Sequence, residues 1–151
     1  MSETTREGAR PDGATGKTPT DLSKFRNEVL AKAGEGGGAN PYVILLGLEP
    51  LDAVGLARRV EEGLSYRTLE HLMTNAGFTR EAMADLVRIK PRTLDRRKKS
   101  GRLEPEESDR LLRVSRVLGQ AIGLFEGDAA AARRWLSSPK RALGGVAPLN
   151  L

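Results

Sequence analysis

Apolar residues recur with helical spacing along most of the chain. The clearest case is the segment 105–126, in which successive apolar positions are separated by three, four, three and four residues, at Leu111, Val114, Leu118, Ala121 and Phe125. A stripe of this kind is typical of an amphipathic helix packed on a core. Further apolar positions widen the stripe, so it could also serve a dimer. No segment shows the strict alternation of a half-buried strand, and the sequence therefore predicts an all-α fold.

Capping and helix-breaking residues divide the chain into further helices. Thr79 is a good N-cap, Pro91 suits the first turn of a helix, and Gly101 suits the residue after its end. The expected helices are one after Asp21 that ends at Gly34, one from Leu51 that ends before Gly63, one between Ser65 and Gly77, one from Thr79 to about Arg88, and then Pro91–Ser100, Pro105–Glu126 and Ala129–Ser137. The apolar segment Tyr42–Leu48 is ambiguous between a strand and a buried helical turn, because Gly47 and Pro50 keep it short.

Composition excludes several classes of chemistry. The 151 residues contain no cysteine and a single histidine, His71, so disulfides, thiol catalysis and histidine-based metal or triad sites are not expected. No cofactor or metal is expected either. The first 20 residues lack the apolar segment of a signal peptide, and Tyr42–Leu48 is too short to span a membrane. We therefore expect a soluble cytoplasmic protein, with residues 1–20 disordered.

Positive charge is concentrated in one segment. The window from Arg88 to Arg102 holds eight Lys and Arg residues and one Asp, a net charge of +7, whereas the whole chain carries +5. The remainder is thus slightly acidic. A solvated helix face would need acidic partners three or four residues away, and only Asp95 supplies one inside the window. The pattern favours a surface that binds phosphate.

The same segment has the pattern of a helix-turn-helix. In this motif one helix braces a second, whose outward residues enter the major groove of DNA. Small or apolar residues stand where the two helices must approach, at Ala84, Val87, Ile89 and Leu94. The turn, where glycine is common, holds Arg88 instead. A left-handed arginine would cost about 1–2 kcal/mol, or the turn is shaped differently.

With Leu94 facing inward, Arg92, Thr93, Arg96 and Arg97 are expected on the outer face of the second helix. Arginine can pair bidentately with guanine, and threonine can reach a base edge or a phosphate. Lysines and arginines near the far end suit phosphate contacts. The predicted DNA-binding residues are Lys90, Arg92, Thr93, Arg96, Arg97, Lys98, Lys99 and Arg102.

Several segments between Arg92 and Gly145 resemble those of a known protein family. The residues that carry the resemblance are Arg92-Thr-Leu-Asp-Arg-Arg, the run Gly101-Arg-Leu-Glu-Pro-Glu-Glu-Ser-Asp-Arg-Leu-Leu-Arg113, Leu124-Phe-Glu-Gly-Asp128, Ala132-Arg-Arg-Trp-Leu136 and Ala142-Leu-Gly-Gly145. Together they resemble Xre/MbcA/ParS-type antitoxins over about residues 50–149. The resemblance implies an Xre-like helix-turn-helix domain followed by a small helical toxin-binding domain. We accordingly divide the chain into a tail (1–20), an N-terminal helix and linker (21–48), a DNA-binding domain (49–103) and a toxin-binding domain (104–151).

The resemblance also implies the partners. In this family the antitoxin binds a RES-domain toxin, which acts on NAD as a glycohydrolase or ADP-ribosyltransferase, and it represses its own operon. A homodimer on a palindromic operator and a larger complex with toxin are expected. The toxin-binding residues implied are Trp135, Leu143, Gly144, Gly145, Pro148 and Leu149. The alternative is that Trp135, Leu136 and Leu143 are core residues of the C-terminal domain.

Two rival functions follow from the same residues. A stand-alone dimeric transcriptional regulator would use the helix-turn-helix and would need no toxin partner. An enzyme is not expected, because the clustered carboxylates lie at the start of a helix, where they ordinarily cap it and offset its dipole. These carboxylates are Glu104, Glu106, Glu107 and Asp109.

Overall fold

The computed structural model describes residues 41–49 and 51–150, and within them it is helical. The elements are η1 (Pro41–Leu46), α2 (Ala53–Glu62), α3 (Tyr66–Ala76), α4 (Arg80–Val87), α5 (Pro91–Ser100), α6 (Pro105–Leu124), α7 (Ala129–Ser137), η2 (Arg141–Leu143) and η3 (Pro148–Asn150). In these residues extended pairing is limited to two isolated bridges, Ser65 with Arg102 and Lys140 with Val146. The all-α prediction is confirmed. The tail, the helix expected after Asp21 and the linker as far as residue 40 lie outside the described residues.

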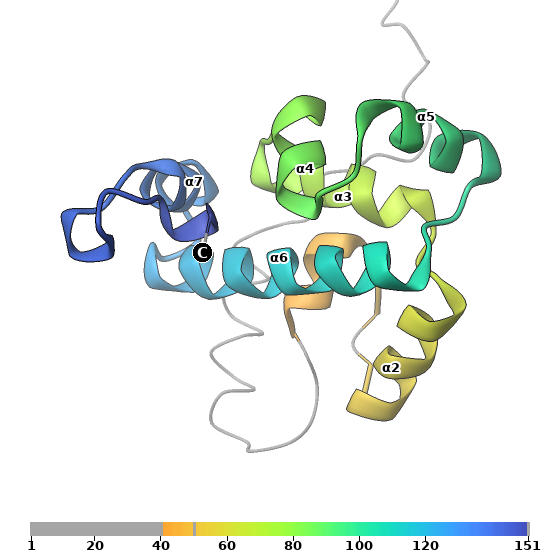
Figure 1. The fold of residues 1–151 in the computed structure, drawn as a ribbon. Coiled ribbons are helices and arrows are strands. Elements are labelled where there is room, and N and C mark those ends of the chain that lie inside the picture. The colour runs from red at the N-terminus through yellow and green to blue at the C-terminus, as the bar shows by residue number, and fades with distance from the viewer. Residues whose placement is uncertain (1–40, 50, 151) are drawn as a thin grey trace, which may run out of the picture.

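The other described helices are arranged around the long helix α6. Figure 1 shows α3, α4 and α5 on one side of α6, with α2 near its N-terminal end and α7 near its C-terminal end. The basic helix α5 and the C-terminal helix α7 therefore lie in different parts of one molecule.

No helix in the described ranges is both long and apolar enough to cross a membrane.

Short polar side chains set where the helices begin. Thr79 Oγ1 accepts a hydrogen bond from the Ala82 N–H at 3.2 Å, and Asp128 Oδ1 accepts one from the Ala131 N–H at 2.9 Å. Asp52 caps α2 in the same way. Each side chain satisfies a backbone donor that the first turn of a helix leaves unpaired. These local signals explain why the predicted starts of α4 and α7 are confirmed.

One continuous core joins both halves of the chain. Leu111, Leu118 and Ile122 of α6 are buried in the same cluster as residues of α3 and α4. The α6 stripe is thus largely internal, although Val117 and Leu124, which widen it, are exposed. Most of the ambiguous segment Tyr42–Leu48 belongs to the 3₁₀ helix η1, which buries Val43, Leu45 and Leu46 in the interior.

The end of α6 differs from the prediction. The helix ends at Leu124 and not at Glu126. Glu126 and Gly127 both have positive φ, of 54° and 92°, and a right-handed helix cannot continue through them. The apolar periodicity runs on to Phe125, so the sequence pattern did not mark this stop.

Candidate nucleic-acid interface and C-terminal surface

The turn between α4 and α5 has the packing expected of a helix-turn-helix. Ala84, Val87, Ile89 and Leu94 are all buried. Arg88 adopts the left-handed conformation itself, with φ 54° and ψ 45°. The Ile89 N–H then donates to the Ala84 carbonyl at 3.0 Å, which closes the end of α4. The alternative of a differently shaped turn is therefore wrong, and arginine occupies a position that favours glycine.

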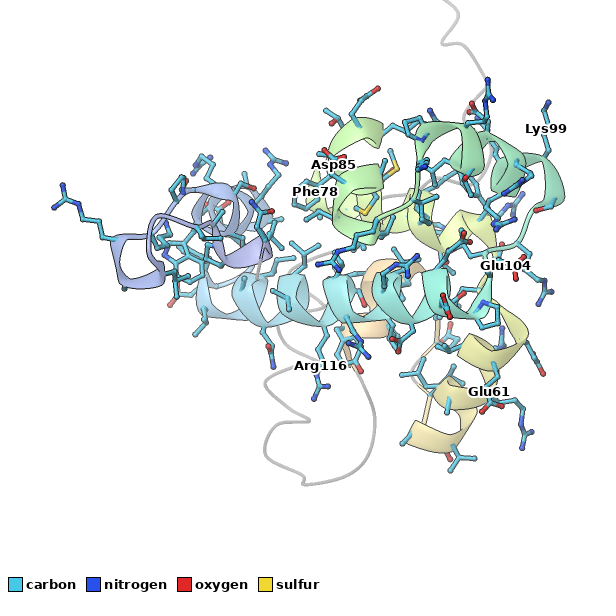
Figure 2. All side chains as sticks on the ribbon, in the orientation of Figure 1. Glu61, Phe78, Asp85, Lys99, Glu104 and Arg116 are labelled. Carbon is cyan, nitrogen blue, oxygen red and sulfur yellow. The ribbon has the colours of Figure 1, made fainter. Side chains whose placement is uncertain are left out.

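Six basic residues of this motif are exposed and make no ion pair or hydrogen bond through their side chains with the residues that the structure describes. They are Arg88, Lys90, Arg92, Arg96, Lys98 and Lys99. Arg92, Arg96 and Lys99 are spaced by four and three residues, so they follow one face of α5. Figure 2 shows Lys99 pointing into solvent at the far end of this helix. Thr93, between them, is partly buried.

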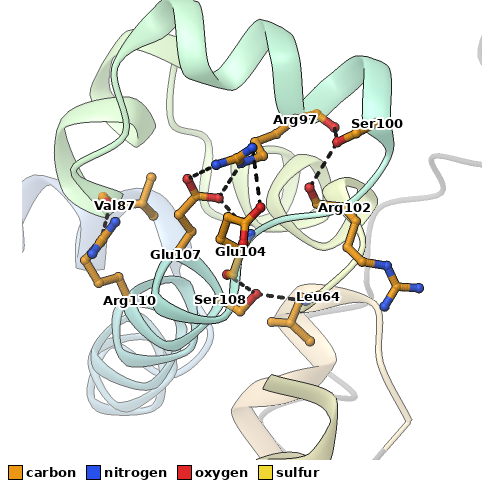
Figure 3. Close-up of polar contacts among 9 residues, drawn as sticks. All are labelled: Leu64, Val87, Arg97, Ser100, Arg102, Glu104, Glu107, Ser108 and Arg110. Atoms are coloured by element: carbon orange, nitrogen blue, oxygen red, sulfur yellow. Dashed lines mark hydrogen bonds and ion pairs between the residues drawn. The ribbon is translucent and has the colours of Figure 1, made fainter. Parts of the chain in front are cut away.

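Arg97 lies on the opposite side of α5. Its Nε donates to Glu107 Oε2 at 2.8 Å and its Nη2 to Glu107 Oε1 at 3.1 Å, and its Nη1 lies 3.6 Å from Glu104 Oε1. Figure 3 shows these contacts. The Arg97 side chain is only 16% exposed. The prediction that Arg97 lies on the outer face is wrong, because it follows the buried Leu94 by three residues and so shares its side of the helix.

Glu107 is held as a carboxylate by these contacts. Burial alone would raise the pKa of Glu107, but hydrogen bonds from Arg97 and from the Glu104 backbone N–H outweigh it and lower that pKa below its ordinary value. The bidentate pair ties α5 to the first turn of α6. Beside it, the buried Ser108 hydroxyl accepts a hydrogen bond from the Leu64 N–H at 2.8 Å, which ties the α2–α3 connection to the same turn (Figure 3).

Arg102 and Arg110 cap helices within the fold. Arg102 Nη1 donates to the Glu62 and Gly63 carbonyls, both at 3.1 Å, at the end of α2. Arg110 Nε donates to the Val87 carbonyl at 2.7 Å, at the end of α4. A guanidinium is favourable there because the last carbonyls of a helix are unpaired and carry partial negative charge. Arg102, which was predicted to contact phosphate, therefore already has an internal role.

Asp95, the single acid of the basic segment, is also occupied. It forms an ion pair with Arg80 at the start of α4. The pair links the two helices of the motif across fifteen residues of sequence, and it leaves the outer face of α5 without an unpaired carboxylate. Sequence spacing gives no signal for such a contact, because it arises from the packing of two separate helices.

The C-terminal region carries exposed apolar side chains. Trp135 on α7 is 44% exposed, its ring centroid lies 6.3 Å from that of Phe125, and Lys140 Nζ lies 5.0 Å from its centre. Leu124 is 81% exposed, and Leu143 and Val146 are also exposed. We call Leu124, Trp135, Leu143 and Val146 the C-terminal apolar surface. Exposed apolar side chains are typical of a protein-binding surface where they form a contiguous patch.

The residues predicted to bind toxin fall into two groups. Trp135, Leu143, Gly144 and Gly145 are exposed, and the last three belong to a tight turn closed by the Lys140–Val146 bridge. Pro148 and Leu149 are partly buried, and Leu149 packs against the core. The alternative in which Trp135, Leu136 and Leu143 are all core holds for Leu136 alone. Leu124 and Val146 were not singled out from the sequence, because a long periodic helix and a Gly-rich turn gave no sign of their exposure.

Comparison with known proteins agrees with this arrangement. Residues 55–116 match the family described as the antitoxin Xre-like helix-turn-helix domain, and residues 120–151 match the antitoxin Xre/MbcA/ParS C-terminal toxin-binding domain. A protein named Antitoxin Xre from Yersinia enterocolitica is 32% identical over 107 residues, which cover 70% of this chain and 72% of that protein. A protein named Prs ADP-ribosylating antitoxin from a Sphingobium species is 28% identical over 135 residues, covering 82% and 83%.

Proposed function

The chain belongs to the Xre antitoxin family, and on that premise we propose that it neutralises a RES-domain toxin and represses its own operon through operator DNA. The observation that carries the proposal is the separation of two surfaces on one core. A helix-turn-helix with six exposed cations, which are unpaired among the described residues, lies on one side of the molecule, and four large exposed apolar side chains belong to the matched toxin-binding domain. The DNA contacts belong to residues 49–103 and the toxin contacts to residues 104–151.

On DNA, α5 enters the major groove. Arg92 and Arg96 read guanine edges, with Thr93 beside them, whereas Lys98 and Lys99 bind phosphate. Arg88 and Lys90 approach the backbone from the turn. Arg97 supports this surface from the inner side of α5, and the exposed Arg102 supports it from the end of α2; neither makes a base contact. Two copies of the chain on a palindrome would place their recognition helices about 34 Å apart.

On the toxin, the C-terminal apolar surface and the 140–146 turn cover the entrance to the active site and hinder access of NAD. The toxin acts on NAD as a glycohydrolase or ADP-ribosyltransferase. The name of the Sphingobium relative, which refers to ADP-ribosylation, supports NAD chemistry in the toxin partner. The antitoxin takes part without catalysis or a cofactor of its own, in the cytoplasm, in a complex larger than one toxin with one antitoxin.

The decisive experiment measures NAD consumption by the RES-like protein encoded beside this chain. We expect an equimolar amount of the chain to suppress consumption and to co-elute with the toxin. The chain mixed with NAD alone serves as the control and should consume none. Undiminished consumption without co-elution would refute toxin binding and would favour the stand-alone dimeric regulator.

A second experiment tests the DNA surface. Arg92→Ala or Arg96→Ala should each cost about 1–3 kcal/mol of operator affinity and relax base preference. Lys98→Ala should weaken binding to specific and non-specific DNA alike. It should also reduce the slope of log affinity against log salt concentration by about one. Unchanged operator affinity in all three variants would refute the assignment of α5 as the recognition helix.

A further inference from the structure

We infer that Arg133 is a positioning residue, which fixes the orientation of the toxin-binding helix α7 on the helix-turn-helix unit by capping the end of α3. The inference rests on the proposed toxin binding, and it concerns a residue that lies away from the proposed toxin-facing surface. It implies that toxin affinity depends on a contact made on the other side of α7 from Trp135.

The contact joins segments far apart in the sequence. Arg133 Nη1 donates to the Ala76 carbonyl at 3.0 Å and to the Gly77 carbonyl at 2.7 Å, fifty-seven and fifty-six residues earlier in the chain. These carbonyls stand at the C-terminal end of α3, where backbone acceptors lack helical partners and a cation is favoured. Phe78, which follows them, lies on the side of the helix-turn-helix unit that faces α7 (Figure 2).

Gly77 allows this approach. A Cβ atom at position 77 would lie 1.8 Å from Arg133 Nη1 and 3.1 Å from its Cζ. Gly77 also has a left-handed backbone, with φ 72°. Gly101 has nearly the same backbone, with φ 78°, but a Cβ there would meet no atom within 4 Å. Position 77 therefore requires glycine for two reasons, and position 101 for one.

The fully buried stripe of α7 is narrow. The helix has nine residues, of which only Ala132 and Leu136 are buried. Ala129 and the Phe125–Trp135 ring contact add to the packing of this stripe, and Arg133 supplies a polar contact between α7 and the end of α3. Arg133 and Trp135 are two residues apart, so they project about 200° apart around α7. The Arg133 contact thus fixes the angle of the helix while the Trp135 side remains open to a partner.

The experiment uses the full chain with its cognate toxin and operator, at a temperature where every variant is folded. Arg133→Ala should weaken toxin binding about tenfold, the equivalent of one lost charge-assisted hydrogen bond, and change operator affinity less than about twofold. Arg133→Lys should restore most of the affinity, because its ammonium can donate to both carbonyls. Gly77→Ala should reproduce the toxin defect of Arg133→Ala. Gly101→Ala, the matched control for backbone strain, should leave toxin affinity unchanged.

The single tryptophan gives a readout that needs no toxin. In the parent chain, Trp135 fluorescence and the helical circular dichroism signal should melt together. In Arg133→Ala and Gly77→Ala, the Trp135 signal should melt at a lower temperature than the helical signal, and the double variant should be no worse than either single one. Coincident melting in all variants, or equal losses of toxin and operator affinity in Arg133→Ala, would overturn the inference. A parent chain that binds no toxin would refute the proposed function and leave the Trp135 test of the contact standing.

Discussion

Arg96 and Arg97 are neighbours of the same residue type, and the structure gives them opposite roles. Arg96 is exposed on the outer face of α5, whereas Arg97 makes a bidentate pair with Glu107. We expect Arg97→Ala to destabilise the fold and Arg96→Ala to weaken DNA binding. Each variant is the control for the other.

The size of the stability effect follows from burial. Removing one partner of a buried ion pair costs about 3–5 kcal/mol, since the other charge stays buried without compensation. The Arg97 and Glu107 side chains are 16% and 9% exposed, so water reaches the edge of the pair. We therefore expect about 3 kcal/mol, the lower end of that range, and a fall of roughly 10–15 °C in Tm. Arg96→Ala should change stability by less than about 0.5 kcal/mol.

The assay pairs urea unfolding with an operator titration at low temperature, where Arg97→Ala is still folded. Arg97→Ala should lose stability and keep most of its operator affinity per folded molecule. Arg96→Ala should keep its stability and lose about 1–3 kcal/mol of operator affinity. Equal unfolding free energies for the two variants, or a larger loss of operator affinity in Arg97→Ala, would refute the assignment.

Four further substitutions test other parts of the structure. Arg88→Gly should raise the free energy of unfolding by up to about 1 kcal/mol, because it removes left-handed strain at a modest entropic cost. It should also lower the salt slope of operator binding, the change in log affinity with log salt concentration, by about 0.9. A lower free energy of unfolding in urea would contradict this. The lowered pKa of Glu107 contributes stability that is fully present above its ordinary pKa of 4.5 and is lost as the pH falls through its lower folded value. Glu107→Gln should remove this pH-dependent contribution to stability. Free energies of unfolding measured as a function of pH test this. Leu136→Ala, at a buried position, should cost about 3 kcal/mol of stability, whereas Trp135→Ala should cost about 1 kcal/mol and chiefly weaken toxin binding in a pull-down titration.

Local signals explain why α5 could be placed from the sequence. Pro91 fits the first turn of a helix, Gly101 ends it with a left-handed backbone, and both bounds are as predicted. The buried positions of the turn were also predictable, because a helix-turn-helix imposes its own spacing on apolar residues. Each of these features depends on residues within a few positions of one another.

Features that depend on packing between helices were not predictable in this way. A count of charges treats all basic residues of the window alike, yet Arg97 and Arg102 donate to groups inside the fold. Their partners are Glu107 on α6 and the end of α2, and only the tertiary arrangement brings these together. The segment 42–48 was ambiguous for a related reason: its few residues are apolar throughout, and only the core around them decides between strand and helix.

Arginines of α6 and α7 cap the ends of α4 and α3, and this predicts which fragments of the chain can fold. Arg110 caps the end of α4 and Arg133 the end of α3, while Leu111 and Leu118 of α6 belong to the common core. A fragment of residues 41–103 contains all the proposed DNA contacts but lacks these caps and core residues. We expect it to be largely unfolded by circular dichroism, and a fragment of residues 41–126 to regain helicity and operator binding, because α6 restores Arg110 and both leucines. A folded 41–103 fragment that binds operator would contradict this and would show that the helix-turn-helix needs no support from α6.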